Sequence, residues 1–120
     1  MTAIEIAGDQ LVIRVLGLDV LASFKREIRV SLQDIDGVAS ATSEMARPPG
    51  LRTLGLSVPG FQAGTFFGAD GKAFWNVHGS GSQAIVVYLR GDGPYQKIVV
   101  DVEDPDEAIR TILRAAATPR

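Results

Sequence analysis

The sequence predicts a mainly β fold that ends in one helix. Short runs rich in β-branched and aromatic residues occupy residues 61–67, 73–77, 84–90 and 97–102, a composition typical of strands. Glycine-rich segments lie between these runs and predict turns. Asp104-Pro105-Asp106-Glu107 then precedes apolar residues at helical spacing. This last pattern predicts a capped helix at the end of the chain.

The first half of the chain adds further strands. They are predicted at residues 4–6, 11–16, 27–32 and 37–42, with a single helical turn at residues 33–36. The run at residues 27–32 alternates apolar and polar residues, which places Ile28, Val30 and Leu32 on one face. Residues 20–24 fit either a short strand or the far side of a bulge. About seven short strands and a terminal helix favour a small antiparallel barrel or sandwich closed by the helix.

The segment of residues 45–59 is predicted to be a long ordered loop. Pro48 and Pro49 cannot lie in a central strand, because proline has no backbone N–H to donate. The segment nevertheless contains apolar side chains, which would hold the loop against the core; these are Leu51, Leu54, Leu56 and Val58.

The C-terminal helix has the clearest local signals. Asp104 is a favourable N-cap residue, Pro105 suits the first helical position, and Glu107 completes a capping-box pattern. The following apolar residues share one side of a helix; they are Ala108, Ile109, Ile112, Leu113 and Ala116. We therefore expect this stripe, including Ile109, Ile112 and Leu113, to be buried against the strands.

Composition narrows the class of protein. The 120 residues are expected to form a single domain covering residues 1–120. The formal net charge is −2, without the basic excess of a nucleic-acid-binding protein. The chain has no cysteine, which excludes disulfides and thiolate metal sites. Neither a signal peptide nor a membrane-spanning stretch is recognisable, so we expect a soluble, cytoplasmic protein.

The order of five short motifs resembles that of bacterial pleckstrin-homology (PH-like) domains. The motifs are VSLQDIDGV at residues 30–38, RTLGLSVPG at 52–60, GTF at 64–66, DGKAFW at 70–75 and VEDPDE at 102–107. This resemblance implies a barrel of two roughly orthogonal antiparallel sheets closed at one end by the C-terminal helix. It also implies an interaction module, since several bacterial members look like oligomer-forming or membrane-associated modules.

Eukaryotic members of the family bind phosphoinositides through basic residues after the first strand. Lys25, Arg26 and Arg29 lie in roughly that region, and they are the candidate anion-binding residues. Their spacing departs from the family pattern, because Ile28 occupies the position two after Arg26. Only weak contact with an anionic ligand or membrane surface is therefore expected.

Catalytic and metal sites are not predicted. His78 is the only histidine, and its neighbours do not form a nucleophile motif. Gly71-Lys72 is followed by Ala73 rather than by the Ser or Thr of a phosphate-binding loop. The acidic residues near Asp104 lack the spacing of a calcium loop. We expect no cofactor and no enzymatic activity.

Adjacent aromatic residues suggest an interaction surface. Neighbouring residues of a strand point to opposite sides, so one member of Phe66-Phe67 and of Phe74-Trp75 should face outward. With the apolar run at residues 16–21, this suggests a surface formed by Leu18, Val20, Phe67 and Trp75. The loop at residues 45–59 could instead cover these side chains. The sequence thus favours an interaction or assembly module that forms a homo-oligomer or binds a protein. The second choice is a weak anionic-ligand or membrane-surface domain, and the third is a small enzyme.

Overall fold

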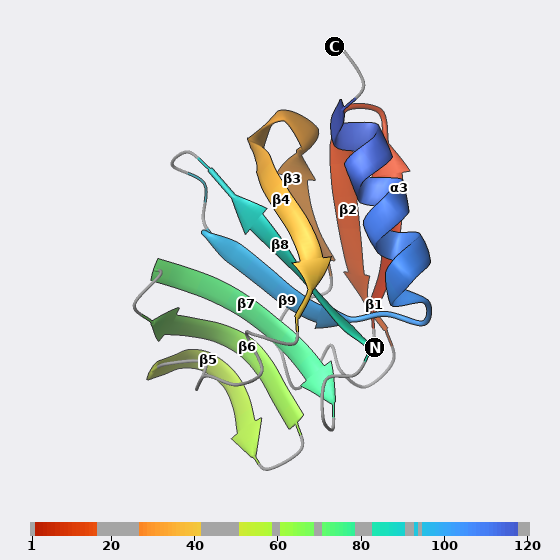
Figure 1. The fold of residues 1–120 in the computed structure, drawn as a ribbon. Coiled ribbons are helices and arrows are strands. Elements are labelled where there is room, and N and C mark those ends of the chain that lie inside the picture. The colour runs from red at the N-terminus through yellow and green to blue at the C-terminus, as the bar shows by residue number, and fades with distance from the viewer. Residues whose placement is uncertain are drawn as a thin grey trace.

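The computed structural model describes residues 2–16, 27–41, 51–58, 61–68, 71–78, 83–90, 93 and 95–117. These residues form a mainly β fold with one C-terminal helix (Figure 1). The elements are β1 (Thr2–Ala7), β2 (Gln10–Val15), β3 (Glu27–Ser31), the 3-10 turn η1 (Leu32–Asp34), β4 (Ile35–Ser40), β5 (Leu51–Val58), β6 (Phe61–Gly68), β7 (Gly71–His78), β8 (Ala84–Leu89), β9 (Lys97–Asp101) and α3 (Pro105–Ala117). Within these residues, no helix is long and apolar enough to cross a membrane.

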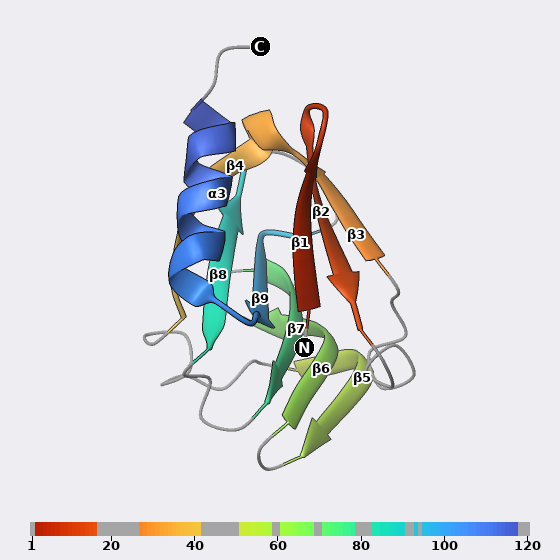
Figure 2. The same ribbon diagram turned by 90° about the vertical axis from the view of Figure 1, so that its right-hand side faces the viewer.

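The strands form two sheets. The smaller sheet is an antiparallel meander of β1, β2 and β3, in which Gly8 turns the chain with a positive φ of 62°. The larger sheet has the order β4-β8-β9-β7-β6-β5. A parallel bridge between Thr2 and Val102 links the start of β1 to the chain just beyond β9. The helix α3 follows directly and packs against β4, β1, β8 and η1 (Figures 1 and 2).

The expectation of about seven strands, all antiparallel, is wrong in two respects. Nine strands are described, and β7 pairs with β9 in parallel. The parallel pair follows from the connections: β8 and β9 form an antiparallel pair, and β9 is inserted between β8 and β7. The strand β8 runs opposite to β7, which precedes it in the chain, and opposite to β9, which follows it. The strands β7 and β9 therefore run in the same direction. Within the described residues, the two sheets do not close into a barrel.

The predicted loop at residues 45–59 is partly a strand. Residues 51–58 form β5, which pairs with β6 at the edge of the larger sheet. The two prolines precede this strand and therefore do not prevent it. Residues 45–50 and residue 59 lie outside the described part of the chain. The alternation of Leu54, Leu56 and Val58 with smaller residues is the period-two pattern that could have revealed the strand.

The larger sheet is buried on both faces. One face shares a core with β1–β3 and α3; Phe74, Ile85, Ile98 and Ile112 belong to this cluster and are fully buried. The other face carries a second cluster that contains Phe66, Trp75, Val86 and Val99. Phe74 and Trp75 are therefore both buried, although they point to opposite sides of β7. The expectation that one of this pair faces outward is wrong, because both faces of the sheet are covered.

The helix begins as its N-terminal signals predict. The carboxylate of Asp104 accepts a hydrogen bond from the backbone N–H of Glu107 at 3.1 Å, which satisfies one of the unpaired donors of the first turn. Ala108 and Ile112 are buried, and Ile109 is half-buried against the same core. Leu113, in contrast, is 45% exposed, so its predicted burial is wrong. The buried side of α3 is narrower than the apolar stripe in the sequence.

Candidate functional site

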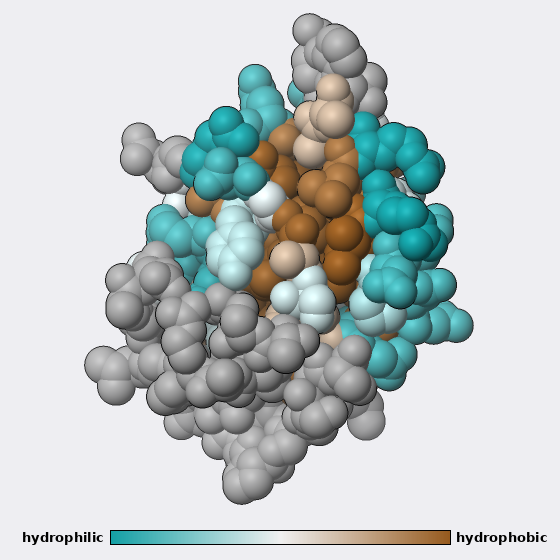
Figure 3. Space-filling model, in the orientation of Figure 1, coloured by the Kyte–Doolittle hydropathy of each residue, from teal (hydrophilic) through white to brown (hydrophobic). Residues whose placement is uncertain are grey.

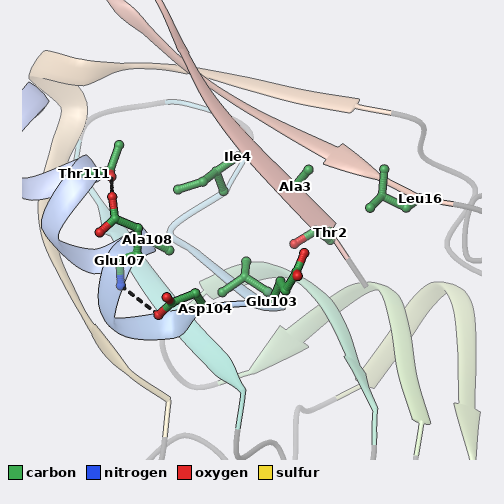
Figure 4. A pocket seen from close by; sticks show the side chains of 10 residues that line it. Thr2, Ala3, Ile4, Leu16, Glu103, Asp104, Glu107, Ala108 and Thr111 are labelled. Carbon is green, nitrogen blue, oxygen red and sulfur yellow. Dashed lines mark hydrogen bonds between the residues drawn. The ribbon is translucent and has the colours of Figure 1, made fainter.

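A groove lies between the edge of β1 and the first half of α3 (Figure 4). Its volume is about 280 Å³. Its walls come from three parts of the chain, namely Thr2, Ala3 and Ile4 on β1, Leu16 after β2, and the segment from Val102 into α3 that includes Glu103, Asp104, Glu107, Ala108 and Thr111. This groove is the strongest candidate binding site among the described residues.

The groove opens on the edge of a strand rather than on a face of the sheet. Thr2, Ala3 and Ile4 are consecutive, and consecutive strand residues point to opposite sides. All three can line one groove only if it runs beside the backbone of β1. In the described chain, β1 pairs with β2 along its other edge, and on this side only the Thr2–Val102 bridge is formed. At Ala3 and Ile4, the edge of β1 that does not pair with β2 therefore faces the groove.

The groove combines an apolar floor with an acidic rim. Ile4, Val102 and Ala108 belong to the floor, and Leu16, which is 46% exposed, lies at the end of the groove farthest from α3 (Figure 4). Glu103, Asp104 and Glu107 form the rim (Figure 4). This arrangement suits a ligand with an apolar body and a positively charged end.

The acidic side chains of the rim differ in their local partners. Asp104 caps the helix, and Glu107 lies 2.9 Å from the guanidinium of Arg110. The hydrogen bond from Arg110 to Glu107 raises the pKa of the arginine above its ordinary value. Glu103 is exposed, and its backbone carbonyl accepts a hydrogen bond from the side chain of Gln83 at 3.0 Å. This hydrogen bond holds the backbone from which the Glu103 side chain lines the groove.

The predicted anion-binding residues are only partly described. Lys25 and Arg26 lie outside the described residues. Arg29 is on β3, where its Nε donates to the carboxylate of Glu27 at 2.6 Å. Arg14 also reaches Glu27, at 3.4 Å. These hydrogen bonds, chiefly the one from Arg29, lower the pKa of Glu27 below its ordinary value.

A second, smaller cavity of about 100 Å³ brings Arg29 close to Arg90, a residue that the sequence argument did not select. Asp34 and Tyr95 also line this cavity. The guanidinium of Arg90 donates to the carbonyl of Ile35 at 2.8 Å and lies 3.5 Å from the carboxylate of Asp36. Each arginine thus has a carboxylate nearby, which reduces the positive potential available to an anion.

Replacing Arg29 with alanine is expected to raise the pKa of Glu27 toward its ordinary value, because the strongest hydrogen bond to the carboxylate is lost. Because the pKa of Glu27 is lowered in the folded chain, this pair stabilises the fold at pH values above the pKa that Glu27 has in the unfolded chain. The contribution disappears as the pH falls through the pKa that Glu27 has in the folded chain. A titration followed by NMR of the Glu27 carboxyl carbon measures the change. Arg14→Ala is the control and should have a smaller effect. An unchanged pKa in Arg29→Ala would contradict this explanation.

The predicted interaction surface is not supported by Trp75, which is only 2% exposed. That part of the prediction is wrong, because the second core cluster encloses the indole. Leu18 and Val20 lie outside the described residues, and Phe67 is described only as part of the backbone of β6. The large apolar residues exposed in the described chain are instead Leu16 and Leu113. Leu16 follows the last residue of β2, and Leu113 lies within α3 at the edge of its apolar stripe.

The described residues contain no group of three or more His, Asp or Glu side chains that could hold a metal ion. Comparisons with protein-family models, with curated proteins and with solved structures find no match for the chain.

Proposed function

We propose that this chain is a non-enzymatic interaction and assembly module with PH-like architecture, and that it pairs with a second copy of itself through the exposed apolar side of α3. The PH-like assignment is supported by two packed sheets followed by a C-terminal helix that shares a core with both of them. The assignment refers to the arrangement of the two sheets and the helix. It does not extend to an all-antiparallel barrel, because β7 and β9 pair in parallel.

The observation that carries the assembly proposal is the exposure of Leu113 beside half-buried apolar neighbours. Ile109, Leu113 and Ala116 are four and three residues apart, so they lie on one flank of α3. The opposite flank, with Glu107 and Thr111, lines the groove beside β1. We call Ile109, Leu113 and Ala116, together with half-buried Val38 of β4, the α3–β4 strip.

Figure 3 shows an apolar area on this face, with hydrophilic side chains on both sides of it. Monomeric proteins seldom leave a large contiguous apolar area in water, and such areas commonly mark contacts with other chains. The exposed Leu113 is the best candidate for the centre of such a contact, because its side chain is the most exposed large apolar group of α3.

Charge favours a second copy as the occupant. Arg110 and Arg114 lie beyond the strip on the solvent side of α3, whereas Asp36 lies on β4. A twofold axis through the strip would bring the arginines of one copy toward Asp36 of the other. Within one copy, Arg110 pairs with Glu107 and Asp36 pairs with Arg90. Both ion pairs are exposed, so each contributes little to stability and can be exchanged for a pair with a second copy. The strip is small, so we expect a weak dimer whose population depends on concentration.

Light scattering after size exclusion, over a range of micromolar concentrations, tests the proposal. The unmodified chain is expected to shift toward twice the monomer mass as concentration rises, and Leu113→Asp should remain monomeric. Leu16→Asp is the matched control, because Leu16 is equally exposed but lies in the groove. A monomeric mass at every concentration, or loss of the dimer in both variants, would contradict pairing through the α3–β4 strip.

The alternative function, a weak anionic-ligand or membrane-surface domain that uses Lys25, Arg26 and Arg29, has less support. Its one favourable observation is that Arg29 and Arg90 line the same small cavity. The carboxylates of Glu27 and Asp36 lie against these two arginines and oppose anion binding.

A further inference from the structure

We propose that the groove between β1 and α3 binds an extended segment of another protein that carries a lysine or arginine side chain. This site is separate from the α3–β4 strip, since it lies on the opposite flank of the helix. The proposal combines the strand edge, the apolar floor and the acidic rim of the groove.

The strand edge provides the main binding interaction. An extended peptide can add to an exposed sheet edge by forming backbone hydrogen bonds, and its alternate side chains then enter pockets that set specificity. Beyond the bridge at Thr2, Ala3 and Ile4 of β1 have their outer edge along the groove. The helix packs against β1 without forming a strand pair there, so it does not satisfy this edge.

The apolar floor provides a place for one side chain. The cavity of about 280 Å³ is at the small end of the usual size of ligand sites. Its volume therefore suits one long side chain rather than a complete cofactor. Leu16, which is 46% exposed, would be covered by the aliphatic stem of such a side chain.

The acidic rim indicates the charge of the occupant. The carboxylate of Glu103 lies beside Thr2 and that of Glu107 lies beside Thr111, so acidic groups stand at two places along the groove (Figure 4). A lysine or arginine reaches such a rim with its charged end while its stem remains on apolar surface. Hydrogen bonds between a cation and a carboxylate are stronger than those between neutral groups. The same carboxylates repel phosphate and anionic lipid headgroups, which makes a basic protein segment the favoured partner.

Peptide titration followed by amide resonances of the protein tests this inference. The probe is a capped six-residue peptide of alternating valine and threonine with one central lysine. Matched peptides carry norleucine or glutamate in place of the lysine. We expect the lysine peptide to shift amides of β1 and of the first turns of α3. We expect norleucine to weaken binding about tenfold, the equivalent of roughly 1.4 kcal/mol for a lost charge-assisted contact. The glutamate peptide should bind more weakly still.

Protein variants separate this site from the assembly surface. Leu16→Asn should weaken binding of the lysine peptide without adding charge to the rim, and Glu103→Gln should reduce the difference between lysine and norleucine. Leu113→Asn is the control, because it has the same exposure on the other flank and should leave peptide binding unchanged. Thermal unfolding of each variant shows that it is folded.

Three outcomes would overturn the inference: no amide shifts at millimolar lysine peptide, shifts located away from β1 and α3, or equal binding of the lysine and norleucine peptides. None of these outcomes bears on self-association through the α3–β4 strip. Conversely, a strictly monomeric chain that binds the lysine peptide would reject the assembly proposal and retain this one.

Discussion

Replacing Trp75 with alanine is expected to lower the free energy of unfolding by about 3–5 kcal/mol, the range for removal of a large buried aromatic side chain. Trp75 is 2% exposed, and its ring meets Phe66 edge-on with centroids 6.4 Å apart. The substitution removes the largest side chain of the second core cluster and leaves a cavity between its neighbours. Equilibrium unfolding in urea measures the loss.

Trp75→Phe is the control for this prediction. It keeps an aromatic ring and removes the indole N–H, which is buried and has no hydrogen-bond partner among the described residues. Loss of an unsatisfied donor offsets part of the lost packing, so Trp75→Phe should cost less than Trp75→Ala. If Trp75→Ala changed stability by no more than about half a kcal/mol, the value typical of surface positions, the second cluster would not be a core.

Replacing Ile112 with alanine is expected to cost about 2–4 kcal/mol. Ile112 is fully buried in the cluster that joins α3 to both sheets. The shortened side chain would leave a cavity at the junction of these elements, because the sheets cannot move inward independently. Urea unfolding monitored by circular dichroism measures the effect.

Leu113→Ala provides a matched comparison at the next position of the helix. Leu113 is 45% exposed, so its truncation should change monomer stability by no more than about half a kcal/mol. Measurement at low concentration avoids any contribution from the proposed dimer. Equal losses at the two positions would mean that the helix is rotated relative to the arrangement described above.

Short sequence patterns correctly predicted the helix cap and the hairpin turns, because each of these depends on residues close together in the chain. The cap at Asp104 and the start of α3 followed from a few adjacent side chains. The hairpins of the second half followed from turn residues between β-rich runs. The strand β5 was missed because two prolines dominated the interpretation, although they only precede the strand.

Features that depend on distant parts of the chain were not predictable from these patterns. Trp75 was expected to be exposed because alternation shows which side a residue faces, but not whether another layer covers that side. The parallel β7–β9 pair arises from the insertion of β9 between β8 and β7. The groove was missed because its walls come from Thr2, Leu16 and Glu107, which only the fold brings together. The one sequence signal was Leu16, a large apolar residue at the end of a strand.

The dependence of amide resonances on protein concentration shows whether this chain associates with itself through the α3–β4 strip. Dilution from millimolar to micromolar concentration is expected to shift amides near Leu113 and Val38, and amides beside the groove are expected to stay unchanged. Leu113→Asp should remove this dependence. Resonances that do not change with concentration, or changes confined to residues away from α3 and β4, would contradict the claim.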